Sequence, residues 1–508
     1  MTIAAADIFP KAALYEVMES GDKMTENKNF KNKLNGEQGL RTGDVLIGTV
    51  NGCTHQGLGV VRAQGQVVFL PNALPDEVVR LEITGFRKGV FSGRVLEQIA
   101  PSPHRAEPKC QLFGRCGGCA LQHAQYEEQL RLKREIVVSS LERIGGLKNS
   151  AELVRPVIGM AEPYHYRSKG VFRPAFYDGR FYFAFLEENS HRVTADRCNL
   201  LFPPQINDLL TAAEEIFNGD FWQLAGELTG ALVRTAFADG QLMLILLLKN
   251  QTPPAKGRKN NKKSKNKPRL DEAVTKQTAE FFEKLKQAVP QLTVFGYSAD
   301  SGEINPIYSN LTILSEHTAI TETIGDVKYE ISAASFFQVN PVQTAKMLEY
   351  IKKIAATCPN PWVIDAYSGI GTIGLALAKV AERVECIEIV PQAVRDAQNN
   401  CRLNNLTNVN CVCGKAEELF HQVSRGCESG QRLVIVDPPR KGCQRQLLEG
   451  ILNFAPEQVV YVSCNPATLA RDLAILTADY EIKSVQPFDM FPQSYHVESV
   501  VLLSKVQK

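Results

Sequence analysis

One cysteine stands where a predicted strand ends and a helix begins. Residues 459–472 read VVYVSCNPATLARD, a run of β-branched and aromatic residues that breaks at residues 463–466 and resumes with a helical pattern. A cysteine with apolar neighbours is usually a small buried residue. At the open end of a strand, however, a thiolate can add to C6 of a pyrimidine, which makes C5 nucleophilic enough to accept a methyl group. Cys464 is therefore a candidate nucleophile.

Such a covalent step requires a base, because the C5 proton must leave before the thiol can be eliminated. The last predicted strand, in SYHVESVV, offers Glu498, with His496 two residues earlier on the same strand face. Glu498 is therefore the candidate base. The alternative is an ordinary surface glutamate at a strand end.

A glycine-rich turn and three acids form a candidate nucleotide site. In DAYSGIGTIG, residues 365–374, three glycines follow a G-x-G-x-x-G spacing between a strand and a helix. Glu388 ends the next strand, where it can accept hydrogen bonds from ribose hydroxyls, and this pattern suits NAD as well as S-adenosylmethionine. Asp365 would repel a pyrophosphate, and Asp437 in IVDPPR ends the fourth strand beside the cofactor. The site therefore favours a methyltransferase over a nicotinamide oxidoreductase.

A second set of cysteines has the number of ligands that a metal site needs. CQLFGRCGGC contains Cys110, Cys116 and Cys119, and DRCNL adds Cys198 as a distant fourth. Four thiolates can hold a tetrahedral zinc ion or an iron–sulfur cluster. The chain has thirteen cysteines and no signal-peptide pattern, so clustered thiols are better explained as ligands or catalysts than as disulfides.

The patterns around these residues predict three domains behind a polar, disordered extension, residues 1–40. Residues 41–100 contain short alternating strands separated by Gly and Pro, which predict a small β-barrel. Residues 101–330 predict a central α+β domain. It is interrupted by AKGRKNNKKSKNKPR, residues 255–269, with eight Lys or Arg and no acid. Residues 331–508 alternate strands and helices, which predicts a doubly wound α/β domain with its site at the carboxyl ends of the strands.

Composition and charge indicate a globular protein that binds RNA. The chain is 44% hydrophobic and 22% charged, without a run of eighteen apolar residues, so we expect a cytoplasmic protein with no membrane segment. The basic run suits a phosphate backbone, although a solvated linker would look the same. PYHYRSKGVFRP, residues 163–174, combines aromatic and cationic side chains that stack on bases and pair with phosphates. No obligate protein partner is evident.

Five motifs in order resemble the bacterial 5-methyluridine RNA methyltransferase family: FFQVNP, DAYSGIGTIGL, DPPRKG, SCNPATLARD and DMFPQSYHVE. Within the predicted barrel, GLGVVRAQGQVVFLPNALPDEVVRLEI resembles the TRAM module, an OB-like barrel attached to RNA-modifying enzymes. The resemblance covers nearly all of residues 43–508. It implies a Rossmann-like S-adenosylmethionine methyltransferase domain, preceded by the barrel and by a central domain with an iron–sulfur site.

The resemblance also implies roles for individual residues. The family's nucleophile falls on Cys464 and its base on Glu498. Its methyl-donor contacts fall on Gln338, Tyr367, Glu388 and Asp437. The family's [4Fe-4S] ligands fall on Cys110, Cys116, Cys119 and Cys198. This favours a cluster over zinc, in a structural or RNA-positioning role, since the reaction needs no electron.

We therefore expect S-adenosylmethionine-dependent methylation of C5 of a uridine that is extruded from folded RNA toward Cys464. The barrel together with the cluster resembles the family members that act on 23S ribosomal RNA, which is the expected substrate. The same chemistry on tRNA is the nearest alternative, and a non-catalytic RNA-binding protein is a more distant one.

Overall fold

A computed structural model of the 508-residue chain describes residues 39–188, 190, 192–194, 196–250, 270–299, 310–427 and 430–506. The expected extension, apart from its last two residues, and the basic run 255–269 lie outside these ranges. The chain forms two compact units. The first comprises residues up to Glu107 together with Ala120–Glu128, and the second comprises Pro108–Cys119 and the chain from Gln129 onward.

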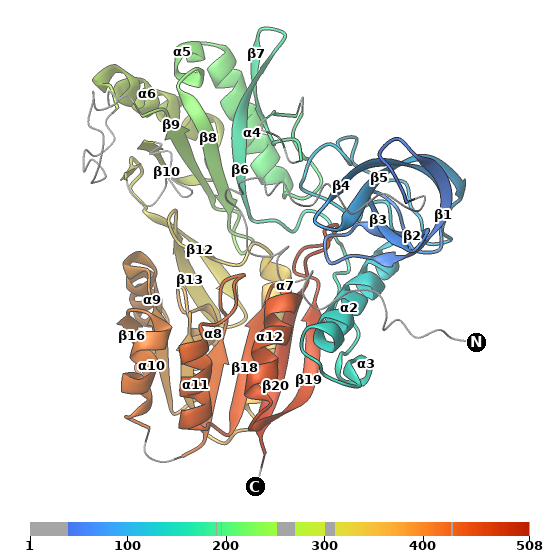
Figure 1. Cartoon of the computed structure of the whole chain (residues 1–508). Coiled ribbons are helices and arrows are strands. Elements are labelled where there is room, and N and C mark those ends of the chain that lie inside the picture. Colours follow the sequence, from blue (N-terminus) through green and yellow to red (C-terminus); the bar gives the residue numbers. More distant parts are fainter. Residues whose placement is uncertain are drawn as a thin grey trace, which may run out of the picture. The chain divides into compact units, whose positions relative to one another are not determined.

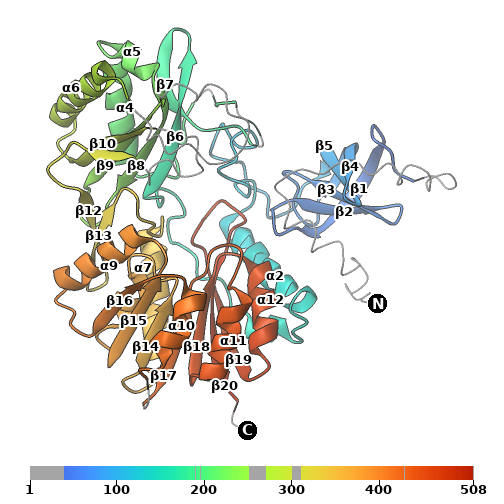
Figure 2. The same cartoon turned by 60° about the vertical axis from the view of Figure 1, so that its left-hand side comes forward.

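The first unit is a closed five-stranded β-barrel (Figures 1 and 2). Its strands are β1 (Val45–Cys53), β2 (Gly59–Ala63), β3 (Gln66–Leu70), β4 (Val78–Arg87) and β5 (Val90–Ala100), in the order β1-β2-β3-β5-β4. Only the pair β3–β5 is parallel. Alternate residues such as Val61, Val68 and Leu81 point inward and form a core of the barrel's own. A five-stranded closed barrel fits the expected OB-like fold.

The second unit begins with α2 (Tyr126–Arg143), whose first three residues belong to the barrel unit, and α3 (Ser150–Leu153). A six-stranded sheet follows, in the order β11-β10-β9-β8-β6-β7. Its strands are β6 (Lys169–Tyr177), β7 (Arg180–Ala184), β8 (Leu228–Thr235), β9 (Leu242–Leu248), β10 (Leu292–Ala299) and β11 (Leu311–Ile313). The helices in this region are α4 (Pro204–Asn218), α5 (Trp222–Ala225) and α6 (Glu272–Ala288).

Both faces of this sheet are covered. Strand β9 reads LMLILLL and is buried throughout, as a strand between two layers must be. Leu244 and Leu246 pack with side chains of α4 and α6. Met243 and Ile245 belong instead to the apolar cluster of the neighbouring hairpin, β12 (Ala319–Ile324) and β13 (Val327–Ser332), and of the region that follows. The predicted central domain therefore shares a core with the predicted catalytic domain.

A seven-stranded sheet forms the rest of the unit, in the order β16-β15-β14-β17-β18-β20-β19 (Figure 2). Its strands are β14 (Trp362–Ala366), β15 (Arg383–Glu388), β16 (Val409–Cys413), β17 (Arg432–Val436), β18 (Gln458–Ser463), β19 (Tyr480–Phe488) and β20 (Glu498–Lys505). The helices are α7 (Pro341–Ala355), α8 (Thr372–Leu377), α9 (Pro391–Leu403), α10 (Ala416–Ser424), α11 (Arg445–Phe454) and α12 (Pro466–Leu476).

Helices cover both faces of this sheet. Side chains of α7, α8 and α9 pack on one face, and those of α10, α11 and α12 pack on the other. Strands β14 to β18 are parallel, whereas β20 runs antiparallel between β18 and β19. The doubly wound α/β domain that the sequence predicted is thus present. Among the described residues, no helix is long and apolar enough to cross a membrane.

The strand order fixes where a site can form. The chain reverses direction across the sheet between β14 and β17, and ligands of such folds bind outside the carboxyl ends of the strands at this point. Because β20 is antiparallel, its first residue lies beside the last residues of β18, where Ser499 is the ladder partner of Ser463. The two candidate catalytic segments therefore meet at that same edge.

Candidate active site

Three of the predicted residues converge at the carboxyl edge of the seven-stranded sheet. Cys464 follows β18, Asp437 follows the neighbouring strand β17, and Glu498 is the first residue of β20. They lie close enough for the charges of Glu498 and Asp437 to act on the Cys464 thiol. The structure thus brings together a thiol and two carboxyl groups that are up to 61 positions apart in the chain.

Burial controls the ionisation of these groups. Glu498 is 2% exposed, and its Oε1 has no hydrogen-bond partner within the described part of the chain. Burial, reinforced by the charge of Asp437, raises the pKa of Glu498 well above its usual value. Burial also raises the pKa of Asp437 to about 7. A carboxylate with a raised pKa is a better base near neutral pH.

Burial and neighbouring charges also control the ionisation of the Cys464 thiol. Burial, followed by the charges of Glu498 and Asp437, raises the pKa of Cys464 to about 12. The guanidinium of Arg440 opposes this shift and also lowers the pKa of Glu498. Arg440 belongs to the DPPRKG motif, but no sequence pattern assigns it a role at the thiol. That role depends on the fold bringing the ends of β17 and β18 together.

Hydrogen bonds fix the turn that carries Cys464. Asn465 caps α12, since its Oδ1 accepts from the Ala467 amide at 3.1 Å. Its Nδ2 donates to the Arg440 carbonyl at 3.0 Å, and the Thr468 hydroxyl donates to the same oxygen at 3.3 Å. The loop after β17 and the turn after β18 are therefore joined directly, which fixes the position of Asp437 relative to Cys464.

A second cluster of interactions shapes the glycine-rich turn after β14. Tyr367, Gly369 and Gly371 all have positive φ angles, of 65°, 58° and 81°. The fully buried Asp365 accepts a hydrogen bond from the Gly374 amide at 2.8 Å, through Oδ2. Burial raises the pKa of Asp365 to about 8. Asp365 therefore fixes the turn by a hydrogen bond to its backbone, whereas the sequence predicted only that its charge would repel a pyrophosphate.

Glu388 and Tyr367, two of the remaining predicted cofactor residues, lie at this turn. Glu388 accepts from the amides of Gly369 at 3.0 Å and Val390 at 2.8 Å, one with each carboxylate oxygen. The half-buried Tyr367 side chain packs against the apolar cluster of α10, α11 and α12. Gln338 is buried in the segment between β13 and α7, two residues after Phe336, which is 61% exposed. No sequence pattern distinguishes Phe336 from the other aromatic residues of the chain.

The four predicted metal ligands all belong to the second unit. The thiols of Cys110 and Cys198 are hydrogen-bonded to each other. Cys116 lies within electrostatic reach of Cys110, and Cys119 within reach of Cys198. Yet a group of three or more His, Cys, Asp or Glu side chains able to hold a metal ion is not found in the described ranges. The structure gathers the thiols in one neighbourhood but not in a metal-binding geometry.

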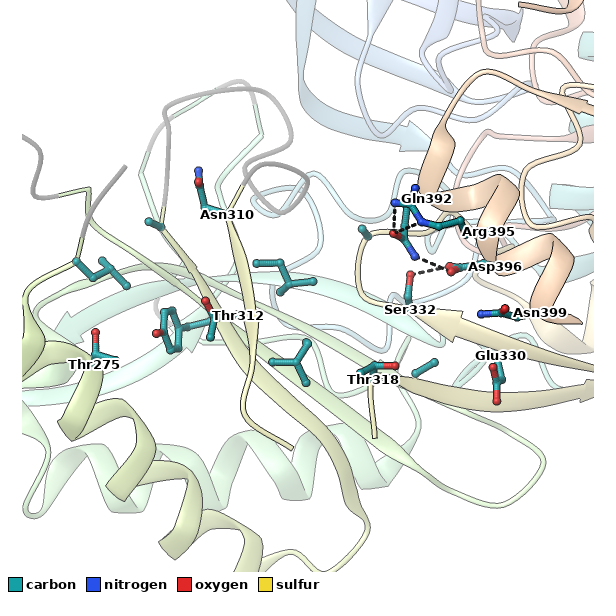
Figure 3. A pocket seen from close by; sticks show the side chains of 17 residues that line it. Thr275, Asn310, Thr312, Thr318, Glu330, Ser332, Gln392, Arg395, Asp396 and Asn399 are labelled. Atoms are coloured by element: carbon teal, nitrogen blue, oxygen red, sulfur yellow. Dashed lines mark hydrogen bonds between the residues drawn. The ribbon is translucent and has the colours of Figure 1, made fainter. Parts of the chain in front are cut away.

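A separate polar pocket lies between β10, β11, β13 and α9 (Figure 3). Its lining includes Asp396, which accepts hydrogen bonds from Ser332 at 2.7 Å and from Gln392 at 2.8 Å. None of the predicted catalytic or cofactor residues lines it. Asp396 also binds the Ser335 hydroxyl, so α9 holds the turn that leads to Gln338.

A protein-family model and several relatives match this chain, and all of them are described as RNA methyltransferases. The family model for tRNA (Uracil-5-)-methyltransferase matches residues 268–506. An uncharacterized RNA methyltransferase of Halalkalibacterium halodurans is 39% identical, over 91% of this chain and 97% of its own length. A similarly named protein of Enterococcus faecalis is 36% identical, over 92% and 98%.

One solved structure is similar over most of the chain. The crystal structure of Pyrococcus abyssi tRNA (uracil-54, C5)-methyltransferase, in complex with S-adenosyl-L-homocysteine, matches with a TM-score of 0.67. It covers 90% of this chain and all of that chain at 22% sequence identity, so the likeness is one of fold.

The raised pKa of Cys464 predicts a pH-dependent reactivity. Because the thiol is protonated at neutral pH, its alkylation by iodoacetamide should accelerate about tenfold per pH unit between pH 7 and 9. Arg440→Gln removes the cation that favours the thiolate, so alkylation at a fixed pH should slow. Quantitative mass spectrometry of the Cys464 peptide measures both rates. A rate that does not change with pH over this range would contradict the prediction.

Proposed function

The chain belongs to the tRNA (uracil-5-)-methyltransferase family of RNA methyltransferases, and we propose that it methylates C5 of a uridine in RNA through a covalent adduct with Cys464. The family assignment confirms the prediction of a methyltransferase over an oxidoreductase or a non-catalytic binding protein. The observation that carries the covalent mechanism is the meeting of a thiol, Cys464, with a buried carboxyl group, Glu498, at the carboxyl edge of the sheet.

The proposed reaction starts at the thiol. Cys464 loses its proton to solvent, its sulfur forms a bond to C6 of the uracil ring, and the electrons of the C5–C6 double bond move onto C5 and O4. C5 then bonds to the methyl group of S-adenosylmethionine, and the methyl–sulfur bond breaks with its electron pair remaining on sulfur. The Arg440 guanidinium supports the first step, because its charge favours the thiolate.

Glu498 completes the reaction as a general base. It removes the C5 proton, the electrons of that C–H bond restore the C5–C6 double bond, and the sulfur of Cys464 leaves C6. Two features support this role: Glu498 has an unpartnered carboxyl oxygen, and its pKa is raised by burial. The product is 5-methyluridine.

For the methyl donor, we propose contacts to Gln338, Tyr367, Glu388 and Asp437. Glu388 is held by two backbone amides, and each of its oxygens keeps a lone pair for a ribose hydroxyl. The positive φ angles of the turn bring its backbone, including Tyr367, toward the same edge of the sheet. Asp437 directly follows β17 and, although largely desolvated, keeps part of its surface exposed, so its carboxyl can still meet a ligand.

We propose 23S ribosomal RNA as the substrate, on the combination of a TRAM-like barrel with the cysteine set that the sequence shares with family members acting on that RNA. Transfer RNA is the second candidate, and the description of the matching family model favours it. Incorporation of labelled methyl groups into unmodified 23S RNA and unmodified tRNA, measured side by side, distinguishes the two.

We also propose that Cys110, Cys116, Cys119 and Cys198 hold a [4Fe-4S] cluster. The contact between the Cys110 and Cys198 thiols and the proximity of the other two support it, although their present geometry is not that of a metal site. Protein purified without oxygen should contain about four iron and four sulfide per chain. Cys198→Ser should lower both contents, whereas Cys413→Ser, at an exposed thiol elsewhere, should not. Equal metal content in the two variants would contradict the proposal.

The covalent mechanism predicts an adduct that can be trapped. RNA that contains 5-fluorouridine cannot lose a proton from C5, so the reaction should stall with RNA joined to the protein. Intact-mass measurement should detect the adduct in wild type and not in Cys464→Ala. With ordinary RNA, Glu498→Gln should accumulate adduct, since elimination waits for the base. An adduct that persists in Cys464→Ala would exclude this cysteine as the nucleophile.

The packing around Gly374 predicts a defect in donor binding. A Cβ atom at this position would lie 2.6 Å from the Cys386 sulfur and 3.0 Å from Asp365 Oδ2, so Gly374→Ala must displace the turn or α8. We expect S-adenosylhomocysteine to bind about tenfold more weakly, by calorimetry, and Cys386→Ala to recover part of the affinity in the double variant. Gly52→Ala, where nothing lies within 4 Å, is the control. Unchanged affinity in Gly374→Ala would contradict the proposed donor site.

A further inference from the structure

The loop that leads to Glu498 is anchored by a buried ion pair. Lys133 on α2 and Asp489, directly after β19, are both completely buried, and their side chains form a salt bridge. The Lys133 ammonium also donates to the backbone carbonyl of Phe491 at 3.0 Å. One side chain from a helix more than 350 positions earlier in the chain thus holds two residues of the 489–497 loop.

A pair of amide side chains extends this contact by one helical turn. Gln129 donates to Oε1 of Gln493 at 3.0 Å, and its own Oε1 accepts from the Gln493 backbone amide at 3.1 Å. Gln493 has a φ of 69°, a left-handed conformation that is unfavourable for a residue with a side chain. Gln129 supplies hydrogen bonds that fit this conformation, so α2 determines how the loop turns.

Other elements hold the opposite side of the same loop. The Tyr166 hydroxyl donates to the Pro492 carbonyl at 3.0 Å, and Asn340 Nδ2 donates to the Met490 carbonyl at 3.1 Å. The Asp489 amide donates to the Ile158 carbonyl at 3.0 Å. Each residue from 489 to 493 is therefore bound to a segment outside the loop, and Lys133 and Gln129 supply the contacts from α2.

The far end of the loop reaches the proposed catalytic groups. His496 lies 3.3 Å from Arg440, between Nε2 and Nη2, and its ring packs against Tyr495 with centroids 4.3 Å apart. Two residues later, Glu498 enters the sheet opposite Phe488 of β19. The loop is thus closed at both ends, and its path determines how the chain approaches Glu498.

A buried ion pair adds little to the stability of the folded protein, because the cost of removing two charges from water offsets much of their attraction. An apolar pair of the same size stabilises the fold at least as well. It does fix geometry, since each partner accepts few positions. The energetics therefore favour a role in placing the loop.

We propose that Lys133 and Gln129 are positioning residues for the reaction, holding the 489–497 loop so that Glu498 reaches the C5 proton of a uracil ring joined to Cys464. This inference rests on the proposed function of Glu498. Proton removal requires the base within hydrogen-bond reach, and displacement by about 1 Å is enough to slow such a step strongly. Addition of the thiol does not use Glu498, so loss of the anchor should affect one half of the reaction more than the other.

The experiment measures the two halves separately in the full-length protein. Adduct formation with 5-fluorouridine RNA reports on attack and methyl transfer, and release of tritium from [5-³H]uridine RNA reports on proton removal. For Gln129→Ala and Lys133→Met we expect adduct formation to stay within about threefold of wild type, while tritium release falls about tenfold or more. Adduct should then accumulate on ordinary RNA.

Two further variants separate positioning from folding. Lys133→Met leaves the Asp489 charge buried, so the double variant Lys133→Met, Asp489→Leu should regain thermal stability while tritium release stays low. Arg197→Met breaks another largely buried salt bridge, to Glu214, which lies outside the loop, and it should leave the ratio of the two rates unchanged.

Recovery of tritium release together with stability in the double variant, or an equal loss in both halves of the reaction, would overturn the positioning role. Neither result would affect the proposed function, which fails separately if Cys464→Ala still forms the adduct or if Glu498→Gln releases tritium at the wild-type rate.

Discussion

Desolvation of acidic groups at one edge of a parallel sheet is the constraint on which the site depends. Burial is the main cause of the raised pKa values of Asp365, Asp437 and Glu498, and it acts on the Cys464 thiol as well. Such an edge suits a cationic ligand, because a positive charge beside these groups favours their ionised forms. The sulfonium of the proposed methyl donor carries that charge. Binding of the donor would therefore also promote formation of the thiolate, which links the first chemical step to occupancy of the site.

Hydrogen bonds between side chains and the backbone hold most of the loops at this edge. Asp365 and Glu388 accept hydrogen bonds from amides of the glycine-rich turn and its surroundings, whereas Asn465 and Asn340 donate to carbonyls of adjoining loops. The antiparallel ladder between β18 and β20 sets the distance between nucleophile and base along the sheet. Side chains that bind backbone can hold loops whose own sequences vary, so the arrangement depends on a few capping residues more than on the loop residues themselves.

Sequence patterns predicted the parts of this architecture that have a local origin. The alternation of strands and helices located the ends of β17 and β18, and hence Asp437 and Cys464. Arg440, Lys133 and Gln129 were missed because their roles arise from contacts between segments that no periodicity relates. The cysteine spacing was a guide to proximity but not to geometry, since the thiols of Cys110 and Cys198 touch without forming a metal site. The boundary expected near residue 330 is crossed by one apolar cluster, to which both β9 and β14 contribute.

That shared cluster bears on how such a protein can diversify. The barrel has a core of its own, drawn from β1 to β5, Leu40 and Ala73, as a domain that can be exchanged as a unit does. The six-stranded sheet has no such freedom, because Met243, Ile245 and Val294 lie in the same cluster as Val363 and Val460 of the seven-stranded sheet. Removing it would open the catalytic interior to water. We therefore expect evolution to change the substrate range of this architecture by exchanging the barrel, and to modify the central sheet only by gradual surface substitution.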